Sequence, residues 1–366
     1  MTNQRPLRDH LRAPLLLGAD NFTPPTRTPW GGTRILGDYK AGAPVAKARR
    51  YDKVGESWEV SVEPDFPSYV ADGGPSLGDV LAADPPFAIG REAAKGRTST
   101  ALLVKLLDTA EPLSVQIHPA DDYPGLQEGE AGKPESWYVL EAAPGAGLYL
   151  GLARATTRAS MEHAIREGDD VSKLLGFVPV SAGDFFLIEA GTAHAIGPGL
   201  TLIEPQHVAP GRRGVTYRYW DWNRRYDAAG RPATGDGGAS RPLHVEDALA
   251  VTDWDAPRGD AFLETMRHQA GSPDLGAPLS VTPLAGPGGP LRSAHLEVER
   301  IAGSGETELN TRDALRSLTV IEGELTLRGK GFDVSVPRGR SAVLPAGLGA
   351  IRAHGEGAHG LLCAIP

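Results

Sequence analysis

The sequence is nearly free of cysteine and has no long apolar run. Its one cysteine, Cys363, excludes a disulfide within the chain and is consistent with a reducing compartment. The longest apolar piece near the N-terminus, PLLLG, is far shorter than the core of a signal peptide or a membrane span. We therefore expect a cytoplasmic protein without a membrane partner.

Basic residues are fewer than acidic ones. The chain has 37 Lys and Arg against 46 Asp and Glu, which gives a formal net charge of -9. Because no Lys/Arg-rich block offsets this balance, a nucleic-acid partner is not expected. The arginine-containing stretch at 207–227 is interpreted as an aromatic strand with solvated arginines. A phosphate-bearing small molecule stays compatible, because a local basic cluster is enough to bind it.

Glycine and proline are plentiful, with 46 and 31 residues, and they cut the apolar runs into short pieces. This pattern predicts many short strands rather than long helices. A chain of 366 residues exceeds the roughly 250–300 residues at which single cores stop growing. Two domains are therefore expected, at 1–254 and 255–366, with helical spacing in an insertion at 155–180.

The predicted elements are short and follow from local patterns of apolar and turn residues. Strands are expected at 101–108, 114–119, 135–140, 183–190 and 200–206, with a turn at 191–199, and short helices at 76–83 and 243–251. His163 falls on the polar side of the helical insertion and is expected to be solvated.

Two stretches hold the densest set of metal-ligand residue types. Gln116 and His118 stand two apart in SVQIHP, and side chains two apart on a strand share a face. Glu135 opens the next strand-like run, and His194 lies in the glycine-bounded turn after FFLI. Two imidazoles, one carboxylate and one amide oxygen suit zinc and leave room for a substrate oxygen. A lone histidine in a strand is more often an ordinary core or surface residue, so the prediction depends on the combination.

Trp30 precedes two glycines at the end of a proline-rich arm. Its flat indole would either line a sugar site or fill the core. Taken alone, the residues favour the core.

The C-terminal part repeats the pattern of the first domain. SLTVIEGELTLRG resembles SWYVLEAAPGAGLYLG, and RGRSAVLPAGLGAI aligns with AGDFFLIEAGTAHAI by its glycines. Gly339 falls on Gly183 and Gly347 on Gly191 in this alignment. The repeat predicts a second β domain of the same kind.

The second copy lacks the ligand residues. Ala350 stands where the first copy has His194, and Arg316 stands where it has Glu135. The second domain is therefore predicted to be structural or an interface element. Its last loop holds His354 and His359, which are predicted to be solvated.

Several motifs in order resemble a known family. They are WGG at Trp30, GESWEVS at 55–61, LLVKLLDTAEPLSVQIHP at 102–119, GKPESWYVL at 132–140, GDFFLIEAGTAHAIG at 183–197 and TYRYWDW at 216–222. Over most of its length the chain resembles the type I mannose-6-phosphate isomerases (phosphomannose isomerases) of the cupin superfamily, in their shorter bacterial form. The resemblance implies a mainly β fold of two cupin jelly-roll β-barrels, with helices attached to the first. It also implies one Zn²⁺ per chain and interconversion of mannose 6-phosphate and fructose 6-phosphate, by a monomer or homodimer.

The resemblance also implies roles for individual residues. The zinc ligands would be Gln116, His118, Glu135 and His194. The substrate pocket would include Trp30, Ser114, Lys133 and Arg218. Catalytic roles would fall to Arg218, Lys133 and Glu204. The proton-transfer base stays open between Lys133, Glu204 and a zinc-bound hydroxide, and Lys133 and Arg218 would alternatively hold the phosphate.

One segment departs from the family pattern. EPQHVAPGRRGVTYR contains His207 and several extra residues before the TYR motif, which leaves substrate preference and any role of Arg212 or Arg213 open. Two rival functions therefore stand beside the first: an isomerase for an unphosphorylated or different aldose, and a non-catalytic metal-binding cupin that senses sugars. An iron dioxygenase is disfavoured because it would favour three histidine ligands.

Overall fold

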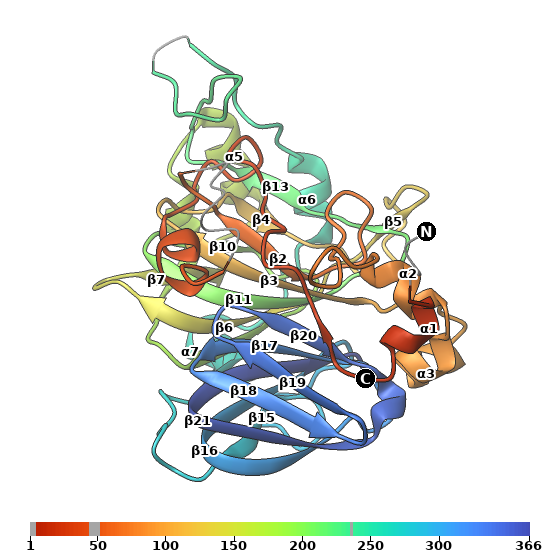
Figure 1. Cartoon of the computed structure of the whole chain (residues 1–366). Coiled ribbons are helices and arrows are strands. Elements are labelled where there is room, and N and C mark those ends of the chain that lie inside the picture. Colours follow the sequence, from red (N-terminus) through yellow and green to blue (C-terminus); the bar gives the residue numbers. More distant parts are fainter. Residues whose placement is uncertain (1–4, 44–51, 235–236) are drawn as a thin grey trace.

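The chain folds into two units of β structure that pack against each other (Figure 1). The computed structural model describes residues 5–43, 52–234 and 237–366. The first unit contains a six-stranded and a five-stranded sheet, and the second, drawn in blue, is built around an eight-stranded sheet. The predicted mainly β fold is confirmed.

The six-stranded sheet has the order β14-β9-β6-β11-β3-β2, and all of its pairings are antiparallel. Its strands are β2 (Glu56–Val60), β3 (Leu102–Thr109), β6 (Glu135–Ala142), β9 (Asp184–Ile188), β11 (Leu200–His207) and β14 (Arg267–Gln269). Apart from β2 and β3, neighbours in this sheet are not consecutive in the sequence, as expected for a jelly-roll arrangement.

The five-stranded sheet has the order β13-β4-β10-β7-β8 and is also antiparallel. Its strands are β4 (Val115–Ile117), β7 (Gly147–Leu152), β8 (Leu175–Pro179), β10 (His194–Ile196) and β13 (Tyr217–Trp220). Apolar side chains from both sheets form one core cluster, which includes Trp137, Val139, Phe186 and Ile188 from the larger sheet and Leu148, Leu150 and Ile196 from the smaller one. The two sheets therefore face each other.

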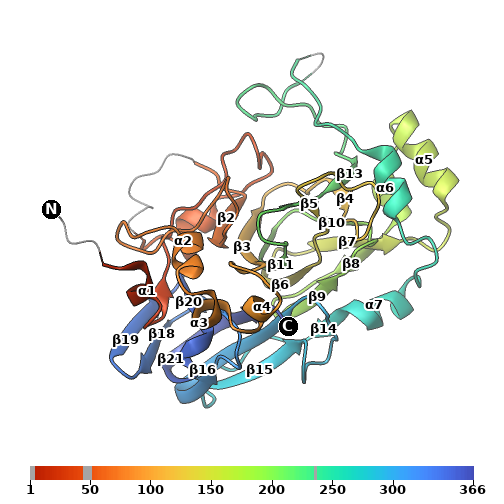
Figure 2. The ribbon, with the colours of Figure 1, turned by 90° about the vertical axis from the view of Figure 1, so that its right-hand side faces the viewer.

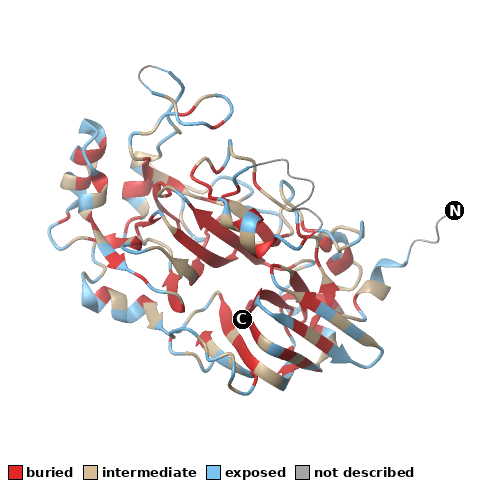
Figure 3. Cartoon of the chain, turned by 60° about the vertical axis from the view of Figure 1, so that its left-hand side comes forward, coloured by how far each residue is buried: buried red, intermediate tan, exposed pale blue. Residues whose placement is uncertain are grey.

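The other face of the six-stranded sheet packs against the second unit. Tyr138, Phe185 and Ile203 alternate with the residues of the first core and join a cluster with residues of the C-terminal sheet. A sheet that is covered on both faces needs nearly continuous apolar strands, which explains the runs FFLI and LTLI. Figure 3 shows this concentration of buried residues in the central strands.

The C-terminal sheet has the order β1-β20-β17-β21-β16-β15, with β18 pairing both β21 and β19. Its strands are β1 (Leu15–Leu16), β15 (Ser280–Ala285), β16 (Glu297–Asn310), β17 (Arg316–Glu322), β18 (Glu324–Gly329), β19 (Phe332–Pro337), β20 (Ser341–Leu344) and β21 (Ala350–Ala364). The N-terminal β1 pairs with β20 near the other end of the chain. After the predicted boundary at 254, α7 (Asp260–Met266) and β14 still pack on the first unit. The division at 254 stays a prediction.

Helices are short and lie at the edges of the sheets (Figure 2). The predicted helix at 76–83 is α2, and the side chain of Ser76 caps it by accepting from Asp79 N. The predicted insertion at 155–180 is helical only in part, because residues 175–179 form β8 instead. Besides α7, the helices are α1 (Leu7–His10), α2 (Leu77–Ala82), α3 (Pro85–Ile89), α4 (Arg91–Ala94), α5 (Arg158–Glu167), α6 (Val245–Val251), the π-helix η1 (Ile35–Tyr39) and the 3-10 helices η3 (Val171–Leu174) and η4 (Ala346–Leu348). Within the described residues, no helix is long and apolar enough to cross a membrane.

A buried ion pair joins the two units. Lys40 Nζ lies 2.7 Å from Glu59 Oε1 and donates to the carbonyl of Gly339 at 2.9 Å. The other oxygen of Glu59 accepts from Ser341 Oγ at 2.9 Å. Lys40 is 1% exposed and Glu59 2%. A buried pair of charges is tolerated only when both are paired and hydrogen bonded, so these contacts favour one arrangement of the units.

His359 was predicted to be solvated, and this prediction is wrong. Its side chain is buried between the units and shares a hydrogen bond of 3.1 Å with Tyr138 Oη. Burial and the nearby charge of Arg300 lower the pKa of His359 to about 4. His359 is therefore neutral in the folded protein at neutral pH.

Acid should destabilise the protein partly through His359. The unfolded chain takes up this proton near its ordinary pKa of about 6.5, whereas the folded protein takes it up only near pH 4. Between these values the unfolded state binds more protons, so stability falls as pH falls, by about 1.4 kcal/mol per pH unit at most. His359→Gln should flatten this slope in urea unfolding measured between pH 7 and pH 4. His354→Gln, a control on the same strand, should leave the slope unchanged. Equal slopes for His359→Gln and the wild type would contradict the assignment.

Candidate metal centre and pocket

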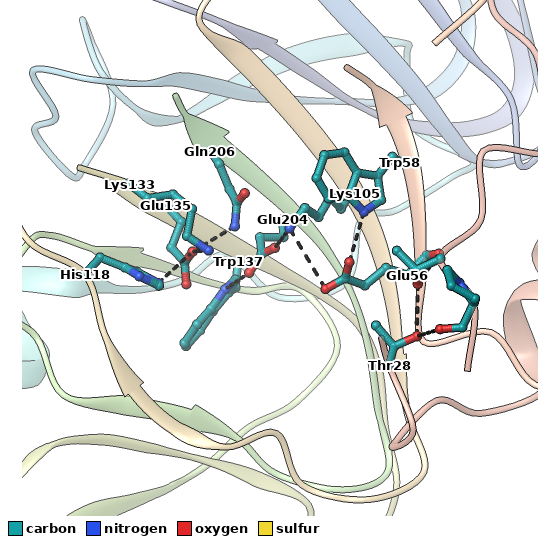
Figure 4. Close-up of polar contacts among 12 residues, drawn as sticks. Thr28, Glu56, Trp58, Lys105, His118, Lys133, Glu135, Trp137, Glu204 and Gln206 are labelled. Atoms are coloured by element: carbon teal, nitrogen blue, oxygen red, sulfur yellow. Dashed lines mark hydrogen bonds and ion pairs between the residues drawn. The ribbon is translucent and has the colours of Figure 1, made fainter. Parts of the chain in front are cut away.

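Two histidines and a glutamate meet inside the first unit (Figure 4 shows His118 and Glu135). His118 follows β4, Glu135 begins β6, and His194 begins β10 rather than lying in a turn. His118 Nε2 lies 3.2 Å from Glu135 Oε2, and His194 Nε2 lies 3.4 Å from Glu135 Oε1. All three residues are at most 2% exposed. The strands therefore bring three of the four predicted ligands together.

The orientation of both imidazoles is fixed by backbone carbonyls. His118 Nδ1 lies 3.0 Å from the carbonyl of Val215, and His194 Nδ1 lies 2.9 Å from that of Thr192. A carbonyl only accepts, so each Nδ1 carries the proton and each Nε2 keeps a lone pair. This is the arrangement of histidines that bind metals.

The three facing atoms lack hydrogen-bond partners. His118 Nε2, His194 Nε2 and Glu135 Oε1 are buried, and none has a hydrogen bond of good geometry to a described residue. Buried polar atoms normally have partners, and convergent lone pairs would be satisfied by a cation. The residues present therefore fit a bound metal ion.

Electrostatics favours the protonation states that a metal requires. Burial lowers the pKa of His118 and lowers that of His194 to about 3, so both rings are neutral. Burial alone would raise the pKa of Glu135, but the charge of Lys133 and the contact with His118 hold it well below its usual range. The centre is thus a carboxylate with two neutral imidazoles.

Gln116, the fourth predicted ligand, lies beside the cluster. On β4 it is the register partner of His194 on one side and of Arg218 on the other. Its side chain lines a cavity of about 350 Å³. Gln116 therefore lies at the boundary between the buried cluster and the cavity.

The cavity also collects the other predicted site residues. Trp30, Ser114, Lys133, Glu204 and Arg218 all line it. Lys133 Nζ lies 3.4 Å from Glu135 Oε2, so this cation stands directly beside the candidate metal centre. The roles predicted for these residues stay predictions, while their placement in one cavity is a feature of the fold.

Trp30 combines the two alternatives left open by the sequence. It is 3% exposed and packs in the core of the first unit, and it also lines the cavity. The glycine after it is required by close packing, because a Cβ on Gly31 would lie 2.3 Å from the backbone nitrogen of Gly55. The WGG and GESWEVS motifs therefore meet in space.

Lys105 and Glu56, which the sequence analysis missed, join Glu204 in a charge network that lines the cavity (Figure 4). Lys105 Nζ lies 3.6 Å from Glu204 Oε2 and 3.9 Å from Glu56 Oε1. It also lies 4.6 Å from the centre of the Trp58 ring. Burial and the charge of Glu135 raise the pKa of Glu204 to about 7. The sequence feature that could have revealed this network is Lys105, the charged residue in the middle of the apolar run ALLVKLLD.

A second missed residue holds Glu135 directly. Gln206 Nε2 donates to Glu135 Oε2 at 2.8 Å, and Gln206 is fully buried. This contact fixes one carboxylate oxygen and leaves the other facing His194. Gln206 lies on β11 opposite Glu135, and such a pairing between strands is not visible in the sequence.

The segment that departs from the family pattern forms a small ribbon at the cavity. β12 (Arg213–Gly214) pairs in parallel with β5 (Glu130–Ala131), and Arg213 forms an ion pair with Glu130. Arg213 lines the cavity, whereas Arg212 is exposed and is not among the lining residues. The ribbon thus borders the loop that carries Lys133.

Comparison with known proteins finds relatives of one family. The model of the phosphomannose isomerase type I catalytic domain matches residues 26–134. A mannose-6-phosphate isomerase of Streptococcus mutans is 34% identical over 224 residues, which cover 61% of this chain and 63% of that protein, less than two thirds of its length. The mannose-6-phosphate isomerase ManA of Bacillus subtilis is 31% identical over 256 residues, which cover 69% of this chain and 72% of ManA.

The fold gives the same result. The crystal structure of a mannose 6-phosphate isomerase from Bacillus subtilis matches with a TM-score of 0.73 and 25% identity, over 96% of this chain and 99% of that one. A zinc-bound mannose 6-phosphate isomerase matches with a TM-score of 0.65 and 15% identity, over 95% of this chain and 98% of that one, which supports the fold alone. Fold and site together define a mainly β protein of the cupin type with a candidate metal centre. The chain belongs to the type I mannose-6-phosphate isomerase family.

Removing one of the three clustered ligands should abolish metal retention. Glu135→Ala and His194→Ala should each lower the affinity for Zn²⁺ by more than about 100-fold, because loss of a supporting contact alone costs about 10- to 100-fold. Metal analysis after dialysis measures this directly. His163→Ala, at an exposed position on α5, should retain as much zinc as the wild type. Full retention in Glu135→Ala would contradict the proposed centre.

Proposed function

We propose that the protein is a zinc-dependent aldose-ketose isomerase that interconverts mannose 6-phosphate and fructose 6-phosphate. The observation that carries this proposal is a His-Glu-His cluster beside a cavity with lysine and arginine in its walls, in a chain of this family. We further propose that it acts in the cytoplasm as a monomer or homodimer. The division into a catalytic domain at 1–254 and a second domain at 255–366 is part of the same proposal.

Four side chains would hold the metal: Gln116, His118, Glu135 and His194. Zinc is supported by the donor set and by the zinc-bound relative. When bound, the ion supplies a positive charge that stabilises negative charge developing on the sugar oxygens.

The protein's own groups would move the proton. Isomerisation removes a proton from carbon 2 of the aldose and delivers it to carbon 1 through an enediol of the sugar, while the hydroxyl proton on O2 passes to O1. Glu204, whose pKa of about 7 suits proton exchange near neutral pH, and Lys133, which stands beside the centre, are the candidate bases. Both line the cavity.

Arg218 is proposed to stabilise or position the reacting sugar. Its Nη1 donates to the carbonyl of Pro242 at 2.8 Å, and its buried Nε has no hydrogen-bond partner among the described residues. Burial and the charge of Arg241 lower the pKa of Arg218 to about 10, so the guanidinium stays positive at neutral pH. An anionic oxygen of the substrate would supply the missing partner.

The rival functions make different predictions for the same cavity. An isomerase for an unphosphorylated aldose would not need the excess of positive charge at Arg218 and Arg241. A sugar-sensing module would not need a carboxyl group with a pKa near 7 beside the centre. Both observations favour the phosphorylated substrate and catalysis.

Activity should depend on zinc. Purified protein should convert mannose 6-phosphate to fructose 6-phosphate in a coupled assay, lose this activity after stripping with a chelator, and regain it when zinc is restored. Parallel assays with free mannose should give much lower rates. Comparable rates on both sugars would instead support the rival isomerase, and no turnover of either would support the sensing module.

Arg218→Ala should separate chemistry from metal binding. We expect a loss of about 100- to 1,000-fold in kcat/KM, the size of effect seen when a charge-stabilising donor is removed. Zinc content should stay at the wild-type level, because Arg218 is not one of the clustered ligands. Arg212→Ala, which alters an exposed arginine outside the cavity, should behave as wild type. Normal turnover in Arg218→Ala would remove this residue from the mechanism.

A further inference from the structure

A second arginine of the cavity wall, Arg241, is held rigidly by a buried carboxylate. Arg241 Nε donates to Asp221 Oδ2 at 2.7 Å, and Arg241 Nη2 donates to Asp221 Oδ1 at 2.5 Å. Asp221 is 4% exposed. This two-point contact uses one edge of the guanidinium and leaves Nη1 outside it. Because Arg241 lines the cavity, its orientation there is set by Asp221.

Asp221 does not neutralise this region. Its Oδ1 also accepts from Arg224 Nη2 at 2.6 Å, so one carboxylate serves two arginines. Arg224 Nη1 also lies 3.3 Å from Glu111 Oε2, a half-exposed contact that is worth little. With Arg218 nearby, the local balance is an excess of positive charge.

Arg241 and Arg218 belong to one connected piece of the wall. The carbonyl of Pro242, next to Arg241, accepts from Arg218 Nη1. His244 N donates to the carbonyl of Arg218 at 2.8 Å, and Arg218 N donates to His244 Nδ1 at 3.2 Å. Three hydrogen bonds therefore fasten the segment that carries Arg241 to the strand that carries Arg218, near the top of the view in Figure 1.

Three of the other cations that line the cavity have acidic partners, and Arg27 stacks on the rings of Trp58 and Phe66 instead. Lys105 lies between Glu56 and Glu204, and Arg213 pairs with Glu130. Lys133 lies beside the ionised Glu135. Apart from Arg27, the positive charge in excess of nearby acids therefore lies at the wall formed by Arg218 and Arg241.

Two guanidinium groups held near each other in a partly buried wall repel. The charge of Arg241 contributes to lowering the pKa of Arg218, second only to burial. A doubly charged phosphate monoester would relieve this repulsion and could accept from both groups, since planar guanidinium groups match phosphate oxygens. A neutral hydroxyl group could not balance the charge.

We propose that Arg241 binds the phosphate group of the sugar together with Arg218, and that Asp221 is its positioning residue. Arg241 thereby determines the preference for phosphorylated over unphosphorylated sugars. The identity of the sugar rests on the proposed function, whereas binding of a phosphate group at this wall does not. No sequence pattern singles out Arg241, which lies in a low-complexity loop.

The test compares Arg241→Gln, Arg241→Lys and Asp221→Asn with the zinc-loaded wild type. The first measurement is binding of inorganic phosphate by titration calorimetry. Arg241→Gln should weaken this binding by about 10- to 100-fold, the range for a hydrogen bond to a charged group. Arg241→Lys keeps the charge but loses the two-point contact with Asp221, so its phosphate affinity should lie between those of Arg241→Gln and the wild type. Arg231 is exposed and pairs with Asp227 away from the cavity, so the control Arg231→Gln should bind phosphate as tightly as the wild type.

The second measurement is kcat/KM for mannose 6-phosphate and for free mannose. Arg241→Gln should lose about 10- to 100-fold on the phosphorylated sugar, mainly through KM, and change by less than about twofold on mannose. Asp221→Asn should raise KM for the phosphorylated sugar with little change in kcat, because Arg241 stays but is held less firmly. A purely structural role of either residue would lower both activities together.

Two outcomes would overturn the proposal. One is unchanged phosphate affinity in Arg241→Gln, and the other is an equal loss on both sugars. If the wild type does not isomerise mannose 6-phosphate, the proposed function fails, but the phosphate titration still decides the role of Arg241. If Arg241→Gln does not fold, as judged by circular dichroism and zinc content, Arg241→Lys decides. A phosphate affinity equal to that of the wild type in Arg241→Lys would refute a role for the guanidinium group held by Asp221.

Discussion

The ionised carboxylate of Glu135, buried between two sheets, is the constraint on which the site depends. A carboxylate that is 1% exposed stays charged only if its surroundings compensate for lost water. Here Lys133 stands beside it, Gln206 donates to one oxygen, and two imidazoles face it. Each group comes from a different part of the chain, so the strands must assemble in one register for the charge to be tolerated. The same register creates the set of lone pairs that suits a cation.

From this centre outward, charges alternate along the cavity. Glu135 is followed by Lys133, Glu204 by Lys105, and Lys105 in turn by Glu56 (Figure 4). Such pairing keeps most of the cavity close to neutral. Positive charge stays in excess at the wall formed by Arg218 and Arg241, and a substrate with a charged end and a neutral reacting end would be oriented by it.

Much of this arrangement was predictable from the sequence. Apolar alternation predicted the strands at His118 and Glu135, and family motifs predicted that these residues meet His194. His194 itself was expected in a turn, but it begins β10. Other features depend on contacts between distant segments, which local patterns do not encode. His359 is buried by contact with the other unit. The start of β8 was predicted to be helical because Leu174 and Leu175 fit the repeat of a helix as well as that of a strand. Arg241 acquires its place only through Asp221, twenty positions earlier along the chain.

The pairing of β1 with β20 has a consequence for how the protein is made. Leu15 and Leu16 leave the ribosome long before their strand partners, Val343 and Ala342. The segment that carries β1 must therefore wait, with its backbone groups satisfied by water, until β20 has emerged. Folding should thus include a late closing step, in which β1 seals the edge of the C-terminal sheet.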